Sequence, residues 1–161
     1  MRVLGIDPGT AVTGYGVVEP SNGRPARLIE CGIIRTDSRA KMWQRLDSLF
    51  EGVSDLIERH RPDALAVESI FYGKNVRTTV VLAQARGVIL LAGARAGLEI
   101  AEFPPAQVKQ CIAGAGGAVK AQVGFMVQQL LRLAGPPAPS DAADGVAVAL
   151  TYLIRRGKRL R

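Results

Sequence analysis

Four acidic residues occupy positions where they could do chemistry together. Asp7 ends the apolar run VLGID and Glu68 ends the run ALAVE, each at the end of a predicted strand. Asp141 and Asp144 are three residues apart in SDAADGVAVAL, so a helix places both on one face near its start. Carboxylate oxygens are the ligands that Mg²⁺ and Mn²⁺ prefer. The four acids can share such ions only if the fold brings them to one place.

The residues around these acids predict a mixed β-sheet flanked by helices. Apolar runs and alternating patterns between turn residues predict five strands, at 2–7, 13–19, 26–36, 64–68 and 98–103. Apolar residues at steps of three and four predict helices over 41–60, 77–96, 107–113, 119–134 and 141–156. Ser140 or Asp141 is expected to cap the last of them. The order βββαβαβ followed by helices indicates an α/β fold with a five-stranded mixed sheet.

The alternation of side chains along a strand indicates where two of the acids point. Asp7 shares its face with Gly5, and Glu68 shares its face with Ala64 and Ala66. If the two strands are parallel neighbours, these acids lie side by side at one edge of the sheet. The last helix is rich in Ala and Gly, so it can approach this small-residue face and bring its two aspartates to the same edge.

Four clustered carboxylates need a compensating positive charge. Without cations, the cluster would cost several kcal/mol or force protonation. We therefore expect two divalent ions, Mg²⁺ or Mn²⁺, bound by the four acids; the only histidine, His60, lies on a different predicted helix. Two such ions roughly 3.5–4 Å apart can activate a water and stabilise a departing 3′ oxygen, which indicates phosphodiester hydrolysis.

Most of the acids also have a simpler interpretation. Asp141 and Asp144 could cap their helix and complement its dipole. Asp7 could be a turn residue, because Asp before Pro-Gly is common turn chemistry. Glu68 is harder to explain in this way, because an acid that closes an apolar strand caps nothing locally. The four together favour a site.

The composition is typical of one folded domain with an anionic partner. The chain has 161 residues, 48% of them apolar, and we expect a domain over 1–155 followed by a basic tail at 156–161. Its formal charge of +7 favours nucleic acid over a neutral small molecule. The tail by itself is typical of a solvated helix end.

The sequence also favours the cytoplasm. No basic-apolar-small leader opens it, and its longest apolar stretch carries Gln84 and Arg86, so neither secretion nor a membrane span is expected. Cys31 and Cys111 are far apart and lie in apolar surroundings, which favours reduced thiols.

Several motifs resemble the RuvC family of bacterial Holliday junction resolvases. They occur in the family's order over nearly the whole chain and read GIDPGT, VES followed by IFYGKN, AQARG, PPAQVKQCIAG and DAADGVAVAL. The resemblance implies an RNase H-like fold and a homodimer. It also implies Mg²⁺- or Mn²⁺-dependent resolution of four-way DNA junctions in recombination and repair. Paired symmetric nicks would leave 5′-phosphate and 3′-hydroxyl ends, and RuvA and RuvB would be the partner proteins.

Individual residues match the family's functional positions. The positions of its catalytic and metal-binding acids are held by Asp7, Glu68, Asp141 and Asp144. Phe71 matches an aromatic residue that the family places at the junction, and Lys109 and Lys120 match its basic residues near the DNA and the cleaved phosphate. Lys120 is thereby a candidate both for catalysis and for DNA binding. The simpler interpretation of the two lysines is a solvated helix face. Lys120 is the stronger candidate, because a predicted helix start favours a phosphate there.

The loop after Glu68 carries aromatic, basic and amide side chains that could bind DNA, namely Phe71, Tyr72, Lys74, Asn75 and Arg77. Aromatic rings can stack on unpaired bases for roughly 1–3 kcal/mol per base, and cations can neutralise phosphates. Such a loop could wedge an opened junction. Alternatively, Phe71 and Tyr72 pack in the core beneath the loop.

The segment 77–96 is apolar on more than one helical face. One face could be buried against a second copy of the chain, and a two-fold dimer would present two cutting centres to a nearly two-fold symmetric junction. The alternative is a fully buried helix in a monomer.

Two other functional classes compete with a junction resolvase. Sugar kinases and actin-like ATPases also use GIDxGT, but they need two lobes to enclose ATP, and 161 residues supply only one. The other class is an RNase H-like nuclease, or a non-catalytic binder, for a different branched nucleic acid. Intact acids argue against lost catalysis but are compatible with a changed substrate.

Overall fold

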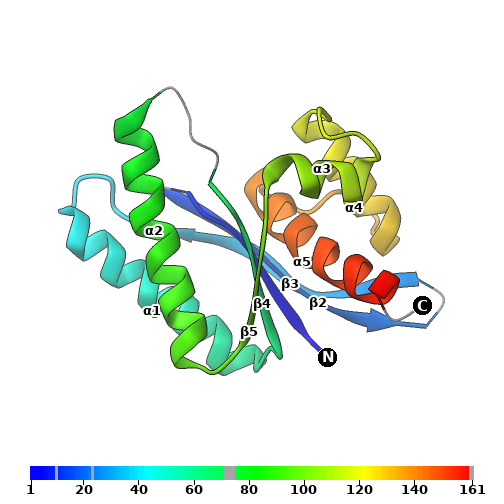
Figure 1. The fold of residues 1–161 in the computed structure, drawn as a ribbon, viewed down its shortest axis with the longest axis horizontal. Helices are drawn as coiled ribbons and strands as arrows, with labels where there is room; N and C mark the ends of the chain where they lie inside the picture. The colour runs from blue at the N-terminus through cyan, green and yellow to red at the C-terminus, as the bar shows by residue number, and fades with distance from the viewer. Residues whose placement is uncertain (10, 23, 71–74, 160–161) are drawn as a thin grey trace.

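In the computed structural model, a five-stranded sheet separates two groups of helices (Figure 1). The structure describes residues 1–9, 11–22, 24–70 and 75–159. The strands are β1 (Val3–Asp7), β2 (Val12–Ser21), β3 (Arg24–Arg35), β4 (Ala64–Glu68) and β5 (Glu99–Phe103). The helices are α1 (Met42–His60), α2 (Val76–Arg95), α3 (Pro105–Ala113), α4 (Lys120–Leu131) and α5 (Ser140–Arg159). The predicted order of elements is confirmed.

The sheet is mixed, with strand order β3-β2-β1-β4-β5. Strand β2 runs antiparallel to its neighbours β1 and β3, whereas β4 runs parallel to both β1 and β5. In the register of β1 and β4, Ile6 is the partner of Val67. The next residues along the two strands are Asp7 and Glu68, so the predicted parallel pairing places these acids at the same edge of the sheet.

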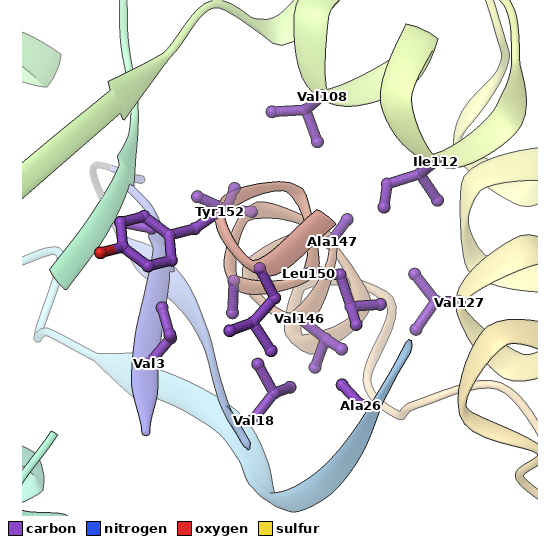
Figure 2. Close-up of a cluster of buried hydrophobic side chains, with 14 of the residues drawn as sticks. Val3, Val18, Ala26, Val108, Ile112, Val127, Val146, Ala147, Leu150 and Tyr152 are labelled. Carbon is purple, nitrogen blue, oxygen red and sulfur yellow. The ribbon is translucent and has the colours of Figure 1, made fainter. Parts of the chain in front are cut away.

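Each face of the sheet has its own apolar core. Helices α1 and α2 cover one face, where Leu4 and Ile6 of β1 are fully buried (Figure 1). Helices α3, α4 and α5 cover the other, where Val3 faces the side chains of α5 (Figure 2). Alternate residues of β1 therefore enter different cores, and the face that carries Asp7 is the one covered by α5.

Helix α5 lies unusually close to the sheet because glycines line the contact. A Cβ atom on Gly5 would lie 2.4 Å from the backbone nitrogen of Ala149, and one on Gly145 would lie 2.4 Å from the Cα of Tyr15. No larger side chain fits at either position without moving the helix. The small residues predicted to permit close approach do so.

Several predicted boundaries differ from the structure. Helix α3 begins at Pro105, two residues early, because the first turn of a helix tolerates proline, whose missing N–H would be unpaired there. Helix α4 ends at Leu131, before a left-handed Arg132. Helix α5 begins at Ser140 and continues to Arg159, so the first part of the basic tail extends the helix.

Candidate active site

Asp7 and Glu68 line one pocket of about 200 Å³ at the edge of the sheet. Asp144, Lys109 and Lys120 line the same pocket. The pocket therefore brings together side chains from two strands and three helices that are as much as 137 residues apart in the sequence (144 − 7). Three of the four predicted acids therefore line this pocket, and Asp141 is not among its lining residues.

The start of α5 reaches this edge through its contact with β2. Asp7 pairs with Gly14 in the register of β1 and β2, and a Cβ on Gly14 would lie 1.8 Å from the backbone oxygen of Asp141. Only a glycine in β2 allows the first turn of α5 to lie at this point. The fold thus places Asp141 next to the strand end that carries Asp7.

Lys120, the first residue of α4, pairs with both aspartates of α5. Its Nζ lies 2.8 Å from Oδ1 of Asp141 and 2.6 Å from Oδ2 of Asp144. Desolvation lowers the pKa of Lys120, but the bonds to the two carboxylates outweigh this effect and hold its pKa above the usual value. The ammonium supplies part of the positive charge that the acids need. A metal cation would compete with it for the carboxylate oxygens, and a phosphate would compete with the carboxylates for the ammonium.

Three of the acids, Asp7, Glu68 and Asp144, lie in a poorly hydrated, negatively charged environment. Burial raises the pKa of Asp7 to about 7, and the carboxylate of Asp144 adds to the effect. Burial, together with the charges of Asp7 and Asp144, raises the pKa of Glu68 to about 8. Burial also raises the pKa of Asp144, against the opposing influence of Lys120. Such raised pKa values are typical of functional sites, where burial and like charges disfavour the ionised carboxylate.

The turn after Asp7 is held by a residue that the sequence patterns do not single out. The buried hydroxyl of Thr13 accepts a hydrogen bond from the Gly9 N–H at 3.4 Å and donates one to the Gly9 carbonyl at 3.2 Å. These bonds tie the start of β2 to the Pro-Gly turn and so fix the end of β1. A Thr shortly after a Pro-Gly turn is the one signal in the sequence that could have indicated this role.

The donor set suits a hard divalent cation. It consists of carboxylate oxygens, and burial together with neighbouring carboxylates raises the pKa of Asp7 and Glu68. Within the described ranges, no three acid, histidine or cysteine side chains are already gathered around one point. The acids lie at one edge of the sheet without surrounding a common point, and the Lys120 ammonium binds two of them, Asp141 and Asp144.

The other predicted site residues fall into three groups. Lys109 lines the pocket, and its charge opposes the rise in the pKa of Glu68. Asn75 caps α2, its side chain accepting a hydrogen bond from the Thr78 N–H at 3.2 Å, and Arg77 is exposed in the first turn of that helix. The predictions for Phe71, Tyr72 and Lys74 lie outside the described residues.

The raised pKa values make the stability of the metal-free protein depend on pH. A carboxyl group whose pKa is near 4 when unfolded and 7 to 8 when folded stabilises the fold below pH 4, and this contribution is lost as the pH rises through 8. We expect the free energy of unfolding to fall by on the order of 7 kcal/mol between pH 5 and pH 8.5 because of these two groups. Urea unfolding with EDTA at the two pH values measures it.

The Asp7→Asn variant is the control for this pH dependence. It removes one of the two groups and leaves every other titrating side chain in place, so its stability should fall less over the same range. Mg²⁺ should restore the stability of the unsubstituted protein at pH 8.5. Parallel pH profiles for the two proteins would contradict the assignment.

Comparisons with known proteins agree over almost the whole chain. The family model described as "Crossover junction endodeoxyribonuclease RuvC" matches residues 3–152. The protein of that name from Pelotomaculum thermopropionicum is 49% identical over 152 residues, which cover 94% of this chain and 92% of the relative.

Solved structures agree with the sequence comparison. The Thermus thermophilus RuvC structure is 35% identical, has a TM-score of 0.89, and is matched over 99% of this chain and 97% of its own. The structure of T. thermophilus RuvC in complex with Holliday junction substrate is 32% identical and has a TM-score of 0.88. The match covers 98% of this chain and 96% of that structure's chain. The predicted RNase H-like fold is therefore confirmed.

Proposed function

We infer the activity of this protein from the family to which it belongs: the chain is a member of the crossover junction endodeoxyribonuclease RuvC family. It is a nuclease that resolves four-way DNA junctions by paired symmetric nicks, in recombination and repair. The match over nearly the full length excludes the sugar-kinase and actin-like interpretation. The observation that carries the catalytic assignment is the convergence of Asp7, Glu68 and Asp144 in one pocket.

The chain's own residues supply distinct functions in the reaction. Asp7, Glu68, Asp141 and Asp144 would hold two Mg²⁺ or Mn²⁺ ions. When bound, the ions would activate the attacking water and stabilise the departing 3′ oxygen, leaving 5′-phosphate and 3′-hydroxyl ends. Lys120, once released from its two aspartates, would contact the scissile phosphate. Lys109, which lines the same pocket, would add positive charge there.

The loop after Glu68 would bind the opened centre of the junction. Phe71 and Tyr72 offer ring faces for unpaired bases, while Lys74, Asn75 and Arg77 offer groups for the backbone. Leu82 of α2 lines a hollow together with Asp7 and Glu68, so the helix that follows Asn75 and carries Arg77 passes this edge, which supports the assignment.

We expect Phe71→Ala to reduce the cutting of four-way junctions by about tenfold, because one stacked base is worth roughly 1–3 kcal/mol. Metal binding should persist, since the acids are unchanged. Single-turnover cutting and Mg²⁺-dependent protection against thermal unfolding measure the two effects separately. An unchanged cutting rate would show that Phe71 is a packing residue.

The outer face of α2 supports a homodimer. Among the helices of the described residues, α2 is the one that is long and apolar enough to cross a membrane. Its inner face, however, packs in the core through Ala85 and Ile89. Its outward stripe is apolar or small at helical spacing and consists of Val76, Val80, Ala83, Gly87 and Leu91. A Cβ on Gly87 would meet nothing within 4 Å, so a second α2 can approach closely there.

Leu91→Asp should convert the dimer to a monomer, because it places a charge in this stripe, where Leu91 is 52% exposed in the single chain. Sedimentation at micromolar concentration should show the mass fall by half. Val119→Asp is the matched control, since Val119 is equally apolar and exposed but belongs to the opposite layer. If Leu91→Asp and the unsubstituted chain sediment alike, this stripe is not the interface.

We also propose partners and a compartment. RuvA and RuvB are the branch-migration proteins that the family resemblance implies. The free cysteines Cys31 and Cys111 are compatible with the cytoplasm, where thiols remain reduced.

One comparison of substrates tests the function. A labelled four-way junction, a linear duplex and an RNA–DNA hybrid are incubated with the protein, with and without Mg²⁺. Symmetric nicks in the junction alone, dependent on Mg²⁺, are the expected result. Equal cutting of the hybrid or duplex would favour the competing nuclease for another substrate.

A further inference from the structure

A second hollow adjoins the active site and shares Lys120 with it. This groove, of about 540 Å³, runs between α4 and the segment that leads into α5. Lys120 lines both the groove and the pocket that holds Asp7 and Glu68, so the two spaces meet at its side chain. Ser140 and Ala143, from the first turn of α5, line the groove next to the catalytic aspartates.

The groove has the chemical character of a site for a nucleobase. One wall is formed by the α4 positions 120, 124, 125 and 128, which follow one side of the helix over about 12 Å, at 1.5 Å per residue. The other wall is formed by residues 136–138, with two proline rings. The ring of Phe125 is 56% exposed, and Gln128 and Ser140 offer polar groups. No acidic side chain is among the described residues that line it.

We propose that this groove binds the nucleotide next to the scissile phosphate, with its base against Phe125. The proposal rests on the proposed function, in which the scissile phosphate lies at Lys120. A strand whose phosphate is held there has its adjacent nucleoside within reach of the groove, because both spaces share that lysine. Aromatic rings hold unpaired bases by stacking. The Gln128 amide nitrogen donates a long hydrogen bond to the Leu133 carbonyl at 3.4 Å, and its amide oxygen can accept one from a base edge. The groove would therefore contribute to the choice of cutting site along the strand.

Two substitutions test the groove in opposite physical ways. Phe125→Ala removes the ring, and we expect single-turnover cutting to fall by about five- to a hundred-fold, the range for loss of one base–aromatic stack. Gly124→Leu instead fills the groove. A Cβ on Gly124 meets nothing within 4 Å, and Leu favours a helix over Gly, so cutting should fall while thermal stability rises. A defect in Gly124→Leu therefore cannot be attributed to unfolding.

Neighbouring glutamines provide the matched pair for specificity. Gln128 lines the groove, whereas Gln129 is exposed outside it. On junctions whose crossover can migrate through many sequences, Gln128→Ala should redistribute the cutting sites, and Gln129→Ala should leave them unchanged. A 2-aminopurine next to the cut site should be quenched by the unsubstituted protein and by Phe125→Tyr, but not by Phe125→Ala.

The outcomes separate this proposal from the proposed function. If the unsubstituted protein does not cut four-way junctions, the function itself is wrong. If it cuts them, and Phe125→Ala and Gly124→Leu cut at the same rate and the same sites with the same quenching, the nucleotide subsite is wrong. The apolar groove would then be left for a protein partner.

Discussion

Replacing Asp7 with Asn should reduce the cutting of four-way junctions at least about a thousand-fold, equivalent to roughly 4 kcal/mol of transition-state stabilisation. The substitution keeps the size of the side chain but removes a carboxylate from the centre of the pocket. An amide oxygen binds a divalent cation much less strongly than a charged carboxylate does. Single-turnover cutting of a labelled junction with saturating protein measures the loss.

Junction binding should survive this substitution. The pocket becomes less negative, so the phosphates meet no new repulsion, and binding without cutting separates the two functions of the site. Asp47→Asn makes the same chemical change at an exposed position on α1 and should cut like the unsubstituted protein. Cutting by Asp7→Asn at the normal rate would end the metal-ligand assignment.

Gly14→Ala should impair cutting about a hundred-fold without touching any reactive group. The added Cβ would lie 1.8 Å from the backbone oxygen of Asp141, so the first turn of α5 has to move away from β2. Misplacement of a catalytic group by about 1 Å can cost this factor, and the overpacking should also destabilise the fold by about 1–3 kcal/mol. Cutting at saturating Mg²⁺ and urea unfolding are the two measurements.

Gly157→Ala is the control for this prediction. Gly157 lies in the last part of the same helix, and a Cβ there meets nothing within 4 Å, so the change should be neutral or slightly stabilising. If Gly14→Ala cuts normally, the close contact between β2 and α5 does not position Asp141.

The sequence by itself determined the elements and the faces of the strands. Periodicity identified all five strands and five helices of the structure in order, because an alternating pattern and a pattern of three and four fit different backbones. Side chains alternate between the two faces of a strand according to their position along it. This alternation also determined that Asp7 and Glu68 share strand faces with small residues. The family motifs added the RNase H-like fold and the activity.

Helix ends were less predictable than helices. Pro105 begins α3 and Arg132 ends α4 in a left-handed conformation, and neither choice follows from apolar spacing. The capping role of Asn75 was also missed, because the same residue type fits a loop that binds DNA.

Only the tertiary structure decided what surrounds the acids. The pairing of Lys120 with Asp141 and Asp144, the raised pKa values of Asp7 and Glu68, and the bonds of Thr13 to Gly9 join residues from separate elements. Small residues in β1, β4 and α5 indicated a close contact, but not the glycines of β2 or which helix residue would meet which strand residue. Local patterns depend on neighbours along the chain, whereas charge, burial and contact depend on residues that are adjacent only after folding.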